Sequence, residues 1–395
     1  MYYLINVLMF FFGCVCFYIQ HLPNLKKMNL RWSYDLKQLP DLSNATNLES
    51  LDLHRCESLV EVPSCIGNLH KVEQLDMGFC INLQVVPTLF NLASLDYVVL
   101  EGCSQLKNFP DISTNIRALA IADTMLEELP KLIRLWYRLR FLSIYGSVRD
   151  PHVGRADIEK IPDWIKDLHG LISLQIFGCP KLRSLPELPG SLETLIANTC
   201  ESLETLVSFP TDSQLVELYF PNCFKLGQEA RKVITQQSST ACLPGRTIPA
   251  EFHHRAIGNS LTFRPGSFGF RICVVVSPKP EMEEHITHYS MSRICINGVP
   301  TDQLMLTGLR EIQGEHLCIT QIDLSDEDRW LEPEKEILLE IITTHQEVDI
   351  IECGVQILTD ETYITIRSYD SRPEQASEDD DEISLMGAMS LMNSE

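Results

Sequence analysis

Apolar residues recur along the first half of the chain in a pattern that returns about every two dozen positions. The phrases NLESLDLHRCESLVEVP, KVEQLDMGFCINLQVVP, SLDYVVLEGCSQLKNFP and GLISLQIFGCPKLRSLP share the form LxxLxLxxCxxLxxLP. A fixed period of this length is typical of a solenoid, in which each unit buries its apolar edge against its neighbours. The units begin at Leu25, Leu48, Val72, Leu95, Ile116, Leu139, Leu171, Leu192 and Leu215.

Within each unit the apolar positions alternate as they do in a β-strand. Aliphatic pairs such as Leu51 and Leu53 are expected to point into the solenoid from a short parallel strand. The residues between them then face solvent on the concave side. The pattern predicts an α/β leucine-rich-repeat solenoid with short parallel strands and an irregular convex side, about nine repeats over residues 22–227.

Most of the units contain a cysteine and a proline at fixed positions. The cysteine stands where the chain turns inward after the strand, and we expect a small buried packing residue with a weak hydrogen-bonding handle there, not a metal ligand. The proline is expected to end the inward turn and to block further backbone pairing on the convex side. The cysteines are Cys56, Cys80, Cys103, Cys179, Cys200 and Cys223, and the prolines are Pro40, Pro63, Pro87, Pro110, Pro130, Pro162 and Pro186.

Charged and aromatic residues alternate with the aliphatic residues of the predicted strands and should be exposed on the concave face. Such a stripe of rings is not needed for folding, and aromatic groups supply much of the energy of protein interfaces. The alternative is that the rings only fill the curved inner face. The predicted partner-binding residues are Arg31, His54, Asp76, Tyr97, Glu101, Phe141, Tyr145, Phe177 and Tyr219.

Past about Lys225 the repeat stops and a different pattern begins. The stretch GQEARKVITQQSSTA predicts a short helix, followed by a linker to make residues 228–241. The apolar runs that follow are short, rich in Val, Ile, Phe and Thr, and divided by Gly and Pro, as in strands. Residues 242–370 are therefore predicted to form an all-β sandwich of the jelly-roll or immunoglobulin-like type.

The two ends of the chain have unusual compositions. Residues 1–20 carry no charge and are about long enough to cross a bilayer, which would tether the rest of the chain on the cytoplasmic side. The alternative is a remnant left by truncation of a longer gene. The acidic tail, residues 371–395, is predicted to be disordered.

Charge and cysteine usage narrow the function. A formal charge of −22 argues against nucleic-acid partners, because phosphates would be repelled. Fourteen cysteines without a CxxC spacing favour a reducing intracellular compartment. His285 and His288 form an HxxH cluster beside acidic residues, but it reads as a polar loop, so we expect no metal, no cofactor and no catalytic site. His253 and His254 are expected to be buried packing residues.

The phrases LPDLSNATNLESLDL, FPDISTNIRALAI, CLPGRTIPAEFHHRAIGNSLT and IIECGVQILTDE resemble the C-terminal half of plant TIR-type intracellular immune receptors, with their repeats and post-repeat jelly-roll domain. The resemblance covers roughly residues 22–368. It implies a cytoplasmic or nuclear protein whose partners are pathogen effectors, guarded host proteins or full-length receptors. The matching post-repeat motif is Pro244, Gly245, Ile248, Pro249, Phe252, Arg255, Gly258, Ser260, Cys353 and Gly354.

The chain also departs from that family. It has no GxxxxGK[ST] phosphate loop and no TIR-like stretch before the repeats, so we expect neither the nucleotide switch nor the NAD-cleaving activity in it. The leading hypothesis is a non-enzymatic recognition module of plant innate immunity, a truncated disease resistance protein. The alternatives are a decayed gene fragment without selected activity and a membrane-tethered sensor or decoy.

Overall fold

The computed structural model describes residues 4–6, 23–122, 129–146, 158–207, 209, 217–265, 269–279, 292–305, 312–323, 335–343 and 348–359. The chain divides into two compact units. We call Met1–Ser213 with Phe224–Ala230 the repeat unit, and Gln214–Cys223 with Arg231–Glu395 the C-terminal unit. The finer domain boundaries predicted from the sequence stay predictions.

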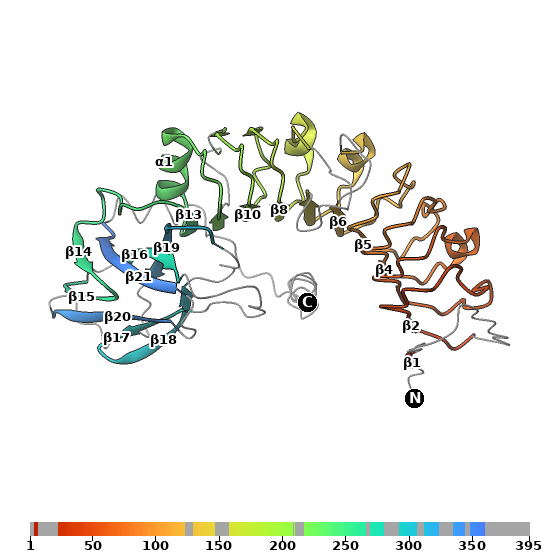
Figure 1. The fold of residues 1–395 in the computed structure, drawn as a ribbon, viewed down its shortest axis with the longest axis horizontal. Coiled ribbons are helices and arrows are strands. Elements are labelled where there is room, and N and C mark those ends of the chain that lie inside the picture. The colour runs from red at the N-terminus through yellow and green to blue at the C-terminus, as the bar shows by residue number, and fades with distance from the viewer. Residues whose placement is uncertain are drawn as a thin grey trace. The chain divides into compact units, whose positions relative to one another are not determined.

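The repeat unit is built on a parallel sheet whose strands follow one another along the chain (Figure 1). The strands pair in register, so that Asn29 lies beside Asp52, and Asp52 beside Asp76. This confirms the predicted solenoid of short parallel strands. The strands are β1 (Leu4–Asn6), β2 (Lys27–Asn29), β3 (Ser50–Asp52), β4 (Gln74–Asp76), β5 (Tyr97–Leu100), β6 (Ala118–Ala122), β7 (Phe141–Tyr145), β8 (Ser173–Phe177) and β10 (Thr194–Asn198).

The repeated leucines and cysteines form the interior. Leu51 and Leu53 are buried, as their alternation predicts. The Cys56 thiol donates to the Leu30 carbonyl oxygen at 3.2 Å, a contact that ties one repeat to the one before it. Burial raises the pKa of the Cys56 thiol to about 12, so it stays protonated and unreactive at neutral pH. The prediction that the repeat cysteines are buried packing residues is confirmed.

The convex side is more regular than its sequence suggests. Three 3₁₀ helices begin directly after Pro63, Pro130 and Pro162: η1 (Ser64–Asn68), η2 (Lys131–Leu135) and η3 (Asp163–Asp167). The prediction that proline prevents pairing here is wrong. Parallel pairing joins β9 (Ser184–Leu185) to β11 (Thr205–Leu206), and Glu61 to Val85. The pairs at Glu61, Val85 and Ser184–Leu185 lie just before a proline, which lacks only its own N–H, and Leu89 pairs with Ile112 just after Pro87 and Pro110.

The C-terminal unit consists of two sheets. The first, in the order β12-β13-β19-β16-β21-β14, is antiparallel except for the parallel pair β12 and β13, and the second, in the order β15-β20-β17-β18, is antiparallel throughout. The strands are β12 (Glu217–Tyr219), β13 (Thr240–Pro244), β14 (His254–Ile257), β15 (Ser260–Phe263), β16 (Gly269–Pro278), β17 (Ser292–Ile296), β18 (Val299–Met305), β19 (His316–Asp323), β20 (Ile337–Thr343) and β21 (Val348–Ile357).

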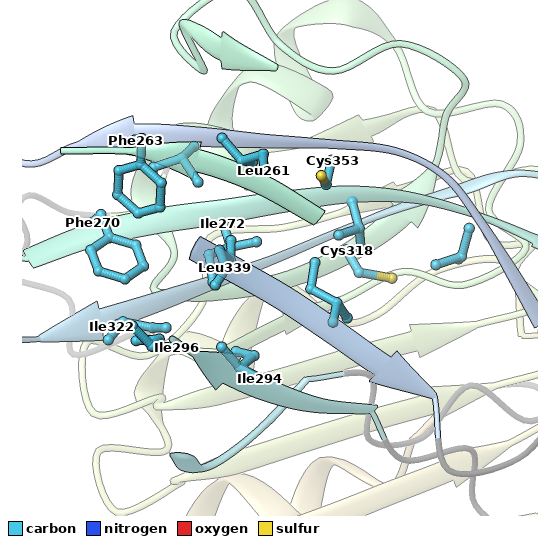
Figure 2. Close-up of a cluster of buried hydrophobic side chains, with 14 of the residues drawn as sticks. Leu261, Phe263, Phe270, Ile272, Ile294, Ile296, Cys318, Ile322, Leu339 and Cys353 are labelled. Carbon is cyan, nitrogen blue, oxygen red and sulfur yellow. The ribbon is translucent and has the colours of Figure 1, made fainter. Parts of the chain in front are cut away.

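One hydrophobic core lies between these two sheets. Figure 2 shows Phe270 and Ile272 of the first sheet among Phe263 and Leu339 of the second. The rings of Phe263 and Phe270 meet edge to face with their centroids 4.9 Å apart. Side chains from both sheets fill a common interior, so the unit is a β-sandwich, as the short apolar runs predict.

A buried arginine ties the end of helix α1 (Gln228–Gln237) to the sandwich. The Arg271 guanidinium donates to the carbonyl oxygens of Thr235 and Ser238, both at 2.8 Å. A cation at a helix C-terminus complements the helix dipole and satisfies carbonyls that have no intrahelical partner. Burial lowers the pKa of Arg271 to about 10, and the group remains charged at neutral pH.

Several sequence predictions fall on residues that the structure does not describe. These are most of residues 1–20, the HxxH cluster at His285 and His288, and the tail 371–395. Within the first segment, the backbone of Leu4–Asn6 forms β1 and pairs in parallel with β2. Among the residues that are described, no helix has the length and apolar character needed to cross a membrane.

Candidate functional site

The concave face, meaning the sheet surface that points away from the leucine interior, carries a row of polar side chains in the first repeats. Asn29, Asp52 and Asp76 each accept a hydrogen bond from the backbone N–H two residues later, at 2.8 to 3.0 Å. These bonds shape the turn that follows each strand. The same register places the two carboxylates side by side on neighbouring strands.

Arg31 and His54 lie beside this pair of carboxylates. The Arg31 guanidinium lies 3.5 Å from Asp52, and the His54 ring lies 3.5 Å from Asp76. Even so, the pKa of Asp52 is raised, first by burial and then by the charge of Asp76. Because a raised carboxyl pKa in the fold destabilises the ionised form, holding Asp52 charged at neutral pH costs stability. We call Asp52 and Asp76, with Arg31 and His54 beside them, the acidic pair.

The aromatic stripe is less exposed than predicted. His54, Asp76, Tyr97, Phe141 and Tyr145 are all buried, whereas Arg31, Glu101 and Phe177 are partly exposed. The reason is packing along the row, because neighbouring strands of one sheet lie about 4.8 Å apart and their side chains meet. Tyr145 stacks on Phe177 with ring centroids 4.8 Å apart. The prediction that these rings stand free in solvent is wrong for the buried ones.

Tyr219 belongs to the C-terminal unit and not to the repeat unit. It lies on β12 in the C-terminal unit, pairs with Cys242 of β13, and packs against the sandwich core. The repeat pattern predicts a place on the concave face for Tyr219, because the last repeat phrase runs through this residue. Its register with β13 could not be read from periodicity alone.

The first part of the post-repeat motif, from Pro244 to Arg255, runs from β13 through a turn into β14. The Arg255 guanidinium closes this turn by donating to the carbonyl oxygens of Phe252 and Pro249, both at 2.8 Å. A Cβ at Gly354 would lie 3.0 Å from the buried Ile248 side chain, so a larger residue there would require Ile248 to shift. Of the remaining members, Pro244 and Cys353 are buried and Gly245 is partly exposed, Gly258 turns with φ +89°, and Ser260 opens β15.

The structure thus assigns these motif residues to the scaffold of the sandwich. His253 and His254 lie beside the turn and are exposed, contrary to the predicted burial. His253 directly precedes β14 and His254 begins it, and the side chains of β14 are largely exposed at the edge of the first sheet.

Taken together, the two units define a leucine-rich-repeat protein with a β-sandwich after the repeats. The chain is homologous to plant disease resistance proteins and corresponds to a C-terminal portion of them. Over 384 residues it is 44% identical to disease resistance protein RML1B of Arabidopsis thaliana, covering 91% of this chain and 37% of that protein. It is 42% identical over 278 residues to RML1A of the same plant, covering 66% of this chain and 28% of that protein.

The chain therefore spans about a third of the length of the curated relatives it matches. Among solved structures, an internalin from Listeria monocytogenes matches with a TM-score of 0.26 and 14% identity, covering 54% of this chain and 78% of that chain. No protein-family model matches the chain. The fold assignment rests on the strands and their register, and the family resemblance predicted from the repeat and post-repeat phrases is confirmed.

Proposed function

We propose that the chain is a non-enzymatic recognition module of plant innate immunity, acting inside the cell. It binds a protein, either a pathogen effector or a guarded host protein, through the concave face of the repeat unit and through the C-terminal sandwich. The homology to disease resistance proteins supports this proposal. Within the chain, the single observation that carries it is the acidic pair.

The acidic pair is costly for folding. Two carboxylates in register repel each other, and burial raises the pKa of Asp52 further. A folded-state pKa above the unfolded one means that stability is highest in acid and falls as the pH rises past the ordinary value of 3.8, so the full cost is present at neutral pH. A basic side chain of a partner protein would relieve this cost on binding.

Asp52→Asn separates folding from recognition. It keeps the shape and an oxygen acceptor for the His54 N–H but removes one charge. We expect the variant to unfold at higher urea concentration at pH 7 than the wild type, and at the same concentration at pH 3. We also expect it to bind a partner about tenfold more weakly.

Binding is measured by titration calorimetry of the purified chain against a panel of pathogen effectors and host proteins. Asp167→Asn is the matched control, because Asp167 is exposed on η3 of the convex side. The proposal is wrong if no protein of the panel binds, or if the convex variant weakens binding as much as Asp52→Asn does.

A further inference from the structure

A second cluster lies just after the carboxyl ends of β2, β3 and β4. Trp32, Arg55 and Phe79 occupy the same place in successive repeats, each three residues after the in-register row of Asn29, Asp52 and Asp76. The Arg55 Cζ atom lies 4.8 Å from the centroid of the Trp32 ring and 4.9 Å from that of Phe79. The guanidinium is therefore held between two aromatic rings.

The backbone at these positions does not favour large side chains. Trp32, Arg55 and Phe79 have φ of 66°, 59° and 55°, in the left-handed region. Their N–H groups reach the carbonyl oxygen of the next repeat, as Arg55 does to Gly78 at 2.7 Å. The equivalent residues in two later repeats are Gly102 and Gly178. A non-glycine residue is strained in this conformation, so the three large side chains need another explanation.

The hydrogen bonds that Arg55 makes, and those that it lacks, suggest an explanation for these large side chains. Among the described residues Arg55 forms no ion pair, and its Nε is buried without a hydrogen-bond partner. By contrast, Arg117 holds both oxygens of Asp96, at 2.7 and 2.8 Å. Guanidinium donors all lie in one plane, and the Arg55 Cζ atom lies over the rings of both neighbours. The N–H groups at the edge of the guanidinium plane are therefore the part of Arg55 that remains for a ligand.

The surroundings of the stack suit a protein ligand. Trp32 is 37% exposed and Tyr34 is 47% exposed, with their ring centroids 6.2 Å apart. Exposed aromatic rings beside an arginine are the composition of interface hot spots. They offer apolar area next to a charged group that is already oriented.

We infer that Arg55, held between Trp32 and Phe79, binds a carboxylate of a partner protein in the plane of its guanidinium, while Trp32 and Tyr34 pack on the same partner segment. Arg forms two parallel hydrogen bonds to a carboxylate, which fixes the orientation of the partner as well as its charge. This inference rests on the proposed function, because it names a second contact point of the same recognition unit. It also predicts a partner segment with an acidic residue facing Arg55.

The test uses the full chain with isotope-labelled arginine and tryptophan, and the blocked dipeptide N-acetyl-Glu-Glu-amide as the probe. The Arg55 Nε–H resonance is identified by its loss in Arg55→Gln, and the Trp32 indole resonance by its loss in Trp32→Leu. We expect both to shift saturably on titration, with the resonance of the exposed Arg138 unchanged. N-acetyl-Gln-Gln-amide should bind at least about tenfold more weakly, since it lacks the charge.

Arg55→Lys keeps the charge but not the fork, and we expect it to weaken the Glu-peptide shift of Trp32 by about tenfold. The inference is overturned if Arg55 does not respond, if the Gln peptide binds as well as the Glu peptide, or if inorganic phosphate binds more tightly than the Glu peptide. These outcomes can be distinguished from failure of the proposed function, because the proposed function is tested by the binding of whole proteins to the wild type and to Asp52→Asn.

Discussion

In the repeat unit the buried thiols meet partners about one repeat away, whereas in the C-terminal unit some partners of buried groups are several times more distant along the chain. The Cys56 thiol reaches a carbonyl 26 residues back, and Cys80 reaches one 27 residues back. In the sandwich, Arg271 and Gln356 are 85 residues apart, and Asn222 and His316 are 94 apart. A repeat array is stabilised by its nearest neighbours, while a sandwich forms as a whole.

The largest test of this contrast uses one core truncation in each unit. Leu75→Ala and Ile272→Ala each remove a fully buried aliphatic side chain, and each should cost about 3 kcal/mol. We expect hydrogen exchange in Leu75→Ala to rise in β3, β4 and β5 but not in β8 or β10. In Ile272→Ala it should rise in all strands of the C-terminal unit. Equal spreading of both effects would contradict the contrast.

Arg271→Ala sharpens the contrast with a polar contact. It leaves the carbonyl oxygens of Thr235 and Ser238 without their donor and should cost the C-terminal unit about 3 kcal/mol. Arg264→Ala is the control, because its ion pair with Glu336 at 3.5 Å is exposed and is worth less than about 1 kcal/mol. The free energy of unfolding of both variants is measured in urea, with hydrogen exchange in α1 and β16 as the probe. A cost for Arg264→Ala as large as for Arg271→Ala would show that the buried contact is unimportant.

The smallest effect is a pH dependence confined to the C-terminal unit. His316 is fully buried, its Nε2 accepts the Asn222 N–H at 2.9 Å, and its Nδ1 therefore carries the proton and donates to the Gly314 carbonyl oxygen at 3.0 Å. Burial lowers the pKa of His316 below its ordinary 6.5. The unfolded chain then takes up a proton first, so stability should fall as the pH drops through 6.5 towards the folded pKa.

His316→Gln should flatten this pH dependence, measured as the urea midpoint of the C-terminal unit between pH 8 and pH 5. His253→Gln is the matched control, because His253 is exposed and should leave the slope unchanged. A wild-type midpoint that stays constant from pH 8 to pH 5 would show that the His316 bonds tolerate protonation.

The same contrast explains how far the sequence alone could predict the structure. The repeat strands, the buried leucines and the thiol-to-carbonyl contacts follow from periodicity, since every unit repeats the same local problem. Burial of Tyr97, Phe141 and Tyr145 could not be predicted, because it depends on which side chains stand beside them in the neighbouring strands. The Trp32, Arg55 and Phe79 stack was missed because it needs the left-handed turn as well as the register.

In the sandwich, the short apolar runs predicted strands but not their partners. The pairing of Tyr219 with Cys242 and the contact of Ile248 with Gly354 join segments whose order no local pattern specifies. The family resemblance singles out the post-repeat motif. The structure shows that Arg255 donates to the turn before β14 and pairs with Gly354 of β21.

The proposed recognition through the repeat unit is tested most directly by hydrogen exchange of the full chain with and without a partner protein identified by calorimetry. We expect the partner to slow exchange in the segments that follow β2, β3 and β4, where the acidic pair and the Arg55 stack lie, and to leave η2 and η3 unchanged. Slowed exchange on the 3₁₀ helices, with those segments unaffected, would contradict the account.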